Sequence, residues 1–241
     1  MILDKLLLIS VGGLTIVWII FYLYALEIDD ISVVAPWFLT IPVFGYILGN
    51  IFLGETLTQN QIIGSGITFV GLIILSINFS KEKRKLKTKT ILYMLLASVI
   101  AALAGIIFKY ITIEGDFWVS SFWEYVGLGL VGIIIYIFIP KYRREFHYMN
   151  KLGGRRIFSL NIANELLSII GNMLTHFSLL LAPIAMVYLV GSFQPAIVLL
   201  LTILGTKFFP KIIKEDMSKR ILIPKIIAIS IMIVGSIFLF V

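Results

Sequence analysis

The chain has 241 residues, of which 60% are hydrophobic and only 14% are charged. A soluble domain is about half apolar and about a quarter charged, so this composition indicates an integral membrane protein. The chain has no cysteine and only two histidines, which excludes disulfides and thiolate metal sites and leaves too few ligands for a histidine-rich metal site.

Apolar runs long enough to cross a bilayer core predict an all-α, polytopic membrane bundle of eight transmembrane helices. A closed barrel is excluded, because its strands would alternate over about ten residues. The predicted spans cover residues 6–26, 32–54, 60–79, 89–113, 116–140, 158–181, 184–206 and 221–241.

Basic residues gather in three of the connecting segments. Residues 81–89, 141–156 and 207–220 hold 17 of the 20 Lys and Arg. These segments follow the third, fifth and seventh spans, so all three lie on one side of the membrane. Basic loops beside spans normally stay in the cytoplasm, which places both termini outside. Nucleic-acid binding is disfavoured, because no soluble domain exists to present the basic residues.

The first two spans carry aromatic and polar residues at helical spacing. A wall of this kind suits small organic ligands, including cations, although each residue taken singly fits ordinary packing equally well. These candidates for substrate binding are Trp18, Tyr22, Tyr46 and Asn50.

The second span also holds a proline, Pro42, and ends on a carboxylate, Glu55. Proline inside a helix removes a hydrogen bond, so Pro42 predicts a helix break. Glu55 is expected at the membrane edge, where it can cap the following helix or reach water. Gly45 and Gly49 form a close-packing motif.

Glu124 lies about eight residues into the fifth span. An acid at that depth could take up a proton or bind a substrate amine. The structural alternative is a salt bridge with Lys109, which is also near the outer end of its span. The structural alternative is the favoured one, and Glu124 is kept as a substrate-binding candidate.

The sixth span carries a polar stripe. Asn161, Glu165, Ser168, Asn172 and His176 are spaced 4, 3, 4 and 4 residues apart, so they share one helix face. Such a stripe suggests a water-accessible pathway, with hydrogen bonding between helices as an equal alternative. Ser168, Asn172 and His176 are candidates for substrate binding. In the seventh span Tyr188, Ser192 and Gln194 are further candidates.

A repeat is detected when the chain is shifted by 153 residues. Pro42 then falls on Pro195, Thr15 on Ser168 and Leu26 on Leu179. The first three helices become equivalent to the last three, and the odd spacing of five spans inverts one copy relative to the other. The sequence therefore predicts an inverted five-helix repeat whose first copy is incomplete. Inverted repeats are typical of secondary transporters. In this repeat Pro42 and Pro195 form a pair of helix breaks.

These motifs resemble the EamA domain of the drug/metabolite transporter superfamily. The resemblance rests on Pro42, on Leu53-Gly54-Glu55, on Gly64 with Gly71, and in the second half on Lys109 and Pro195. It covers essentially the whole chain and implies a first repeat at 1–80, a basic linker at 81–89 and a second repeat at 90–241. The family usually has ten helices with both termini in the cytoplasm. This chain therefore departs from it in helix number and in the orientation that its charges predict.

The leading hypothesis is a secondary transporter that moves a small metabolite or drug-like solute by alternating access. The alternative is a non-transporting membrane subunit or a flippase partner for lipid-linked groups. An enzyme is disfavoured, because no HExxH motif, cysteine or intramembrane aspartate pair occurs. No cofactor or metal is expected. The expected location is the plasma membrane of a prokaryote, where the protein could form a homodimer.

Overall fold

The computed structural model describes residues 2–29, 34–76, 88–191, 193–208 and 219–239. Within these residues the chain forms helices and turns, and no strand. The α-helices are α1 (Ile2–Ile28), α3 (Thr40–Leu53), α4 (Gln59–Ser76), α5 (Thr88–Ile113), α6 (Phe117–Phe138), α7 (Pro140–Leu181), α8 (Ile184–Gly191), α9 (Gln194–Phe208) and α10 (Lys219–Leu239), and η1 (Ala35–Leu39) is a 3₁₀ helix.

Five helices are long and apolar enough to cross a membrane. They comprise α1, α5, α6, residues Ile157–Leu181 of α7 and residues Leu222–Leu239 of α10. Three further apolar helices are shorter, at Trp37–Leu53, Gln59–Ile74 and Leu199–Phe208. The prediction of an all-helical, multi-pass membrane protein is confirmed, whereas the count of eight spans stays a prediction.

Two predicted spans are divided into shorter helices. In the second, the 3₁₀ helix η1 ends at Leu39 and α3 begins at Thr40, so Pro42 lies in the first turn of α3. In the seventh, α8 ends at Gly191 and α9 begins at Gln194, so Pro195 also lies in a first turn. A first turn tolerates proline because its N–H groups have no partner inside the helix.

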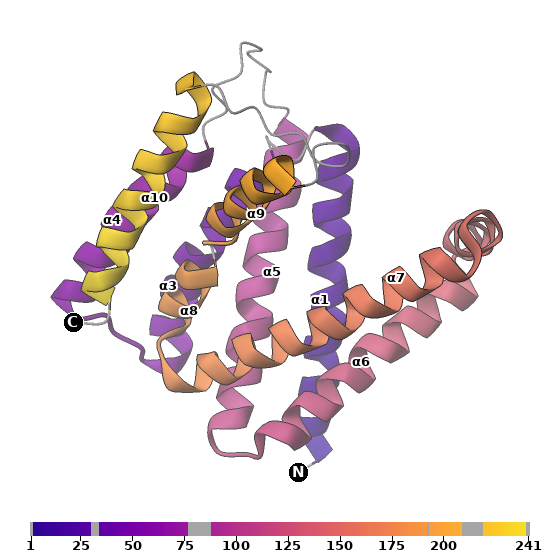
Figure 1. The fold of residues 1–241 in the computed structure, drawn as a ribbon. Helices are drawn as coiled ribbons and strands as arrows, with labels where there is room; N and C mark the ends of the chain where they lie inside the picture. Colours follow the sequence, from indigo (N-terminus) through magenta and orange to yellow (C-terminus); the bar gives the residue numbers. More distant parts are fainter. Residues whose placement is uncertain (1, 30–33, 77–87, 192, 209–218, 240–241) are drawn as a thin grey trace.

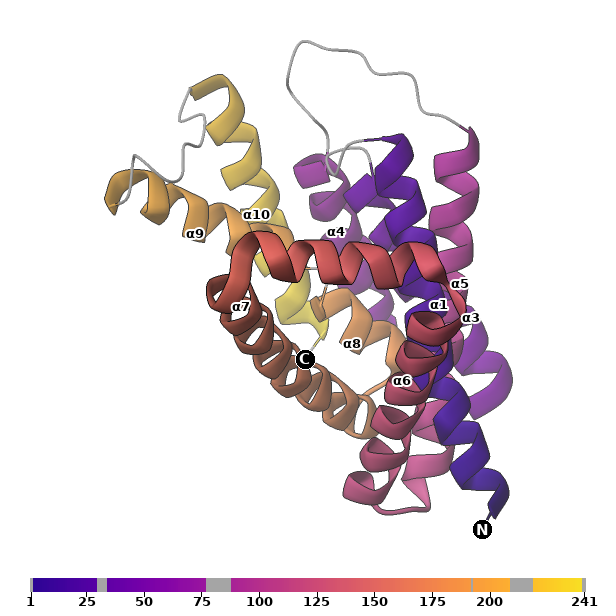
Figure 2. The ribbon, with the colours of Figure 1, turned by 90° about the vertical axis from the view of Figure 1, so that its right-hand side faces the viewer.

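The basic segment 141–156 is helical, where the sequence suggested a connecting loop. It opens α7 with Pro140 in the first turn and contains no glycine until Gly153. Gly154, at φ 50° and ψ −143°, then turns the chain into the span at Ile157–Leu181. Figure 2 shows the two parts of α7 running in different directions. The segment forms a helix because nothing in it interrupts one before this glycine.

Glycines set the closest contacts between helices. A Cβ on Gly12 of α1 would lie 2.2 Å from the carbonyl oxygen of Glu124 on α6. A Cβ on Gly64 of α4 would lie 2.7 Å from the carbonyl oxygen of Gly235 on α10, so the backbones of α4 and α10 touch. Small residues permit this approach, which provides the packing attraction that holds helices together in lipid.

Figure 1 shows the elements arranged between two ends of the bundle. α1 and α6 begin at the bottom of that view, which is called the lower end below. α4 and α9 end, and α10 begins, at the opposite end. The long second part of α7 crosses obliquely between them and reaches the lower end where α8 begins. This arrangement places the junctions of α5 with α6 and of α7 with α8 at the lower end.

Candidate functional site

An ion pair lies inside the lower end of the bundle. Oε1 of Glu55, in the turn after α3, is 2.5 Å from Nζ of Lys109 on α5, and both side chains are largely buried. Nζ of Lys109 also donates to the carbonyl oxygen of Ala182, 2.7 Å away. The N–H of Ile184, the first residue of α8, donates to Oε2 of Glu55 at 2.8 Å. One buried pair thus joins α3, α5 and the start of α8.

Two glycines bring Glu55 to this position. Gly54 has φ 64° and ψ 20°, the left-handed conformation that ends a helix and that glycine adopts without strain. The turn directs the side chain of Glu55 back over α3. A Cβ on Gly49 would lie only 2.8 Å from Oε2 of Glu55, so the carboxylate fits because Gly49 has no side chain. The Leu-Gly-Glu motif is therefore a helix end that orients an acid.

The expectation that Glu55 caps the following helix is wrong. The cap of α4 is Thr58, whose Oγ1 accepts from the N–H of Gln61 at 3.3 Å, while its own N–H donates to Oε1 of Gln61 at 3.0 Å. This reciprocal arrangement is a capping box. Glu55 instead accepts a hydrogen bond from the N-terminus of α8. A negative carboxylate is favourable there, because the N-terminus is the positive end of the helix dipole.

A second buried acid lies near the first pair. Glu124 on α6 is 3% exposed, and its Oε2 is 3.0 Å from Nδ1 of His176 on α7. Apart from this contact, Oε2 has no hydrogen-bond partner, and neither has the buried Oγ of Ser121 one turn earlier. The alternative in which Glu124 pairs with Lys109 is wrong, because Lys109 pairs with Glu55.

An aromatic ring stacks on the histidine and belongs to a cluster of phenylalanines. The ring of Phe108 stacks on the imidazole of His176, with centroids 4.3 Å apart and planes 26° apart. Phe117 meets both Phe108 and Phe177 edge to face, at 6.4 Å and 5.5 Å. Phe108 precedes Lys109 on α5, so neighbouring residues of one helix contact the two acidic sites. An apolar shell strengthens electrostatic interactions inside it.

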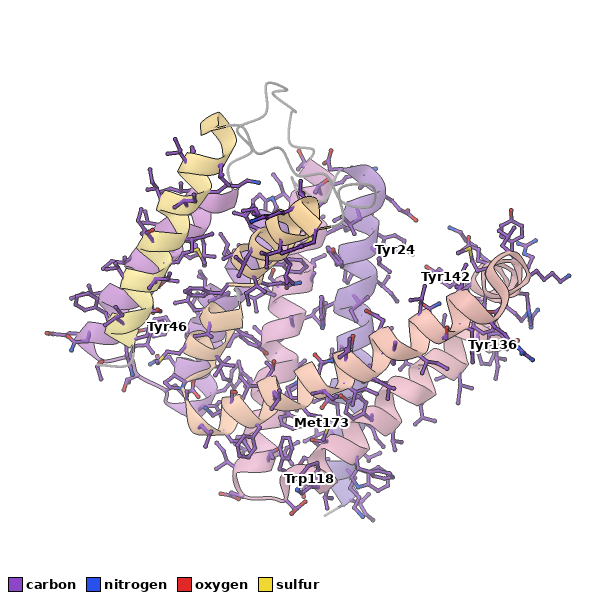
Figure 3. All side chains as sticks on the ribbon, in the orientation of Figure 1. Tyr24, Tyr46, Trp118, Tyr136, Tyr142 and Met173 are labelled. Atoms are coloured by element: carbon purple, nitrogen blue, oxygen red, sulfur yellow. The ribbon has the colours of Figure 1, made fainter. Side chains whose placement is uncertain are left out.

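The polar stripe of α7 is mostly uncovered by the rest of the chain. Asn161, Glu165 and Asn172 are exposed, whereas Ser168 and His176 are partly covered. The stripe approaches the lower end of the bundle, and only its last member, His176, meets a buried acid. Figure 3 labels Met173, which marks this part of α7, and Trp118 and Tyr136 near the two ends of α6.

The aromatic candidates of the first span take part in packing. The rings of Trp18 and Tyr22 lie 6.4 Å and 5.0 Å from that of Phe38. Tyr46 on α3 is exposed, and Nδ2 of Asn50 donates to the carbonyl oxygen of Glu55 at 2.9 Å, which fixes the turn after α3. These candidates therefore do not converge with His176 on one site.

The candidates from the seventh span are dispersed. The hydroxyl of Tyr188 on α8 donates to the carbonyl oxygen of Ala101 at 3.2 Å and lies directly over Gly105 of α5. Gln194 is exposed at the start of α9, and Ser192 lies outside the described residues. Among the described residues, no three His, Asp or Glu side chains lie close enough together to hold a metal ion.

The sequence did not reveal which residues pair at this site. Sequence reasoning singled out Glu55 and Lys109 as family features without pairing them, although opposite charges near the same membrane surface were a usable signal. It also overlooked Phe108, because an apolar aromatic residue in a membrane helix carries no distinguishing pattern. The contact between Glu124 and His176 joins two residues that were proposed separately.

Comparisons with known proteins give a family and a fold. Residues 3–77 match the model of the EamA-like transporter family. No curated protein matches the chain significantly. One solved structure, described only as "Crystal structure of protein", matches 97% of this chain and 74% of its own chain with a TM-score of 0.66. Its sequence identity is 14%, so this likeness speaks for the fold alone.

The family match includes three of the motifs identified in the first half of the chain. Pro42, the Leu-Gly-Glu turn and the glycines of α4 all lie within residues 3–77. The spanning helices and this match together point to a multi-pass membrane protein. The resemblance found in the sequence is confirmed over residues 3–77, which match the EamA-like transporter family.

Proposed function

We propose that this protein is a secondary transporter that moves a small metabolite or drug-like solute across the membrane by alternating access. The observation that carries the proposal is the polar face of α7. Asn161, Glu165 and Asn172 are not covered by the chain, although they lie in a helix of spanning length. Polar and charged groups in contact with lipid are costly, so such a face borders water or a polar ligand.

The divided helices support the same proposal. α8 ends at Gly191 and α9 begins at Gln194 within one predicted span. Hydrogen bonds continue through the break, since the N–H of Phe193 donates to the carbonyl oxygen of Val190 at 3.0 Å and Phe193 accepts from Ala196 at 2.9 Å. Non-helical backbone at membrane depth is tolerated where protein or water satisfies it, and transporters place substrates beside such breaks.

The repeat supports rocking of two halves. The contacts of α3 with α8 and of α4 with α10 join the second predicted span to the seventh and the third to the eighth, which are the spans that the predicted repeat pairs. At the first contact Gly45 of α3 faces Ile184 and Tyr188, and at the second Gly71 of α4 faces Met232. Contact between paired spans is the arrangement that a pseudo-symmetry axis between the two halves would produce. Motion of one half against the other about this axis would open the two sides in turn.

Reconstitution tests the proposal. The purified chain is placed in liposomes, and uptake of labelled amino acids, amines, sugars and nucleotides is measured beside thermal stabilisation by each compound. We expect at least one compound both to stabilise the protein and to be taken up. Absence of flux and of stabilisation across the panel would favour the alternative, a non-transporting subunit or a flippase partner.

A pair of variants tests the polar face itself. Asn172→Ala removes an amide from the stripe, whereas Leu174→Ala removes an exposed apolar side chain about 200° around the same helix. Uptake should fall in the first variant and stay near the wild-type rate in the second. Equal uptake by both would exclude Asn172 from the pathway.

A further inference from the structure

Glu124 and His176 form a contact between a buried acid and a histidine. Glu124 is 3% exposed, and the side chain of His176 is 20% exposed. Nδ1 of His176 on α7 lies 3.0 Å from Oε2 of Glu124 on α6, so the contact joins the side chains of these two helices. A buried carboxylate needs a compensating charge or a proton, because desolvation strongly disfavours the isolated anion.

The cations nearby are already engaged. Lys109, on α5, pairs with Glu55 and donates to Ala182. Lys5, on α1, lies over the ring of Trp123 with Nζ 5.2 Å from the centroid. In the part of the chain that the structure describes, His176 is thus the basic side chain in contact with Glu124.

Other titratable groups on the helices of the pair and on the helices packed against them include acids and phenols. The hydroxyl of Tyr125 on α6 donates to the carbonyl oxygen of Ile169 at 3.3 Å, and Tyr188 approaches from α8. Glu165 lies three turns before His176 on α7, and Asp4 lies at the start of α1. None of these supplies a positive charge. The pair is therefore neutral only when it holds one proton, either as imidazolium with carboxylate or as imidazole with carboxylic acid.

We infer that Glu124 and His176 form a proton-binding site that couples proton movement to the separation of α6 from α7. The inference rests on the proposed function and names its coupling ion. When the lower end opens, water reaches the pair and one N–H or O–H bond breaks, which releases a proton to water. The pair then changes from charge 0 to −1. The hydrated carboxylate cannot return to its buried position until a proton binds again.

The environment of the pair is built for this exchange. Oε2 of Glu124 and Oγ of Ser121 are buried polar atoms with unused hydrogen-bonding capacity. Phe108 covers one face of the imidazole and limits access of water while the helices are closed. The exposed polar face of α7 ends at the same histidine, so a route for water or protons leads to the pair.

A distance measurement tests the inference without a known substrate. The chain has no cysteine, so Phe122→Cys on α6 and Leu181→Cys on α7, both exposed, accept spin labels without further changes. The labelled full chain in lipid nanodiscs is examined by electron paramagnetic resonance at pH 5, 7 and 9. We expect one short distance at pH 5 and a growing longer population at pH 9.

Two substitutions make the test specific. Glu124→Gln removes the titrating acid, so the distance distribution should no longer change with pH. His147→Asn removes the other histidine, which is exposed and contacts Tyr136, and should leave the pH response intact. Should Glu124→Gln fail to give a folded, monodisperse protein, His176→Gln replaces it, and its distance distribution should then lack the wild-type pH response. A pH-independent distance in the parent chain, or an unchanged response in the substituted chain, would overturn the inference.

The outcome is distinguishable from failure of the proposed function. Solute uptake that does not depend on a proton gradient, together with a pH-independent distance, would overturn the proton-binding site and leave the proposed transport function standing. A pH-dependent distance without flux of any panel compound would keep the proton site and remove solute transport.

Discussion

Glu55 and Lys109 meet across the lower end of the bundle, with Oε1 and Nζ 2.5 Å apart. The pair also binds backbone groups of Ala182 and Ile184, so two side chains determine how the start of α8 sits against α3 and α5. Removing one partner of a buried ion pair strongly destabilises the folded state, because the remaining charge stays buried without compensation.

Loss of one partner should be severe. Glu55→Gln or Lys109→Met is expected to lower the free energy of unfolding by about 3–5 kcal/mol, the usual consequence of leaving one buried charge unpaired. Unfolding in mixed micelles by denaturant, followed by circular dichroism, measures the change. Lys151→Met, on the exposed part of α7, is the matched control and should change stability little. A similar loss in the control would remove the pair as the cause.

The double substitution shows how much of the loss in stability comes from leaving one buried charge unpaired. Glu55→Gln combined with Lys109→Met leaves no unpaired charge, so we expect it to be more stable than either single variant. The same unfolding measurement gives the coupling. Losses that simply add would mean that the two residues act independently, against the 2.5 Å contact.

The contact between α4 and α10 depends on glycine at one face of α4. Gly64→Ala would place a Cβ 2.7 Å from the carbonyl oxygen of Gly235, which forces the helices apart. Gly66→Ala adds the same methyl group where nothing lies within 4 Å, and should stabilise the helix by about 0.5–1 kcal/mol. Thermal unfolding of the two variants should therefore shift in opposite directions. A shared direction would mean that the glycines do not set this contact.

The cap of α4 is separable from the buried pair. Thr58→Ala removes the side chain that accepts from the N–H of Gln61 and should cost about 1 kcal/mol of stability. Thr56→Ala, two residues earlier and also exposed, is the control and should have little effect. Hydrogen exchange of the first turn of α4 localises the change. Unaltered exchange in Thr58→Ala would argue against the capping box.

Alkaline pH should weaken the contact of the first part of α7 with α1. A hydrogen bond to Tyr24 raises the pKa of Tyr142, which lies outside the spanning part of α7, above its usual value of 10.0. Figure 3 labels both tyrosines. Because the folded state holds this proton more tightly, the contribution is complete below pH 10 and is lost as pH rises through the raised pKa.

Ultraviolet titration tests this direction. The absorbance of tyrosinate should rise at a higher pH in the native chain than in the unfolded chain, and Tyr142→Phe should reduce the amplitude of that late component. The effect on stability should be small, because Tyr142 lies largely at the surface. A late component of unchanged amplitude in Tyr142→Phe would contradict the raised pKa of Tyr142.

The physical class of the protein was predictable from the sequence. Long apolar runs can only be satisfied as helices in lipid, so composition alone led to a helical membrane bundle. Local motifs whose residues restrict the backbone conformation could also be recognised in the sequence. Gly54 predicts a helix end, and Pro42 predicts an interruption, because each follows from the dihedral angles that its residue type allows. The family resemblance rested on these same residues.

Partnerships were decided by the tertiary structure. Glu55, Lys109, Glu124 and His176 all stand out as charged or polar groups in apolar helices, yet spacing along a helix says nothing about which helix lies opposite. The pairing of Lys109 with Glu55, and of Glu124 with His176, follows from the positions of α5, α6 and α7 at the lower end. The sequence by itself determined which groups needed a partner, and the packing of the helices decided which partner each one has.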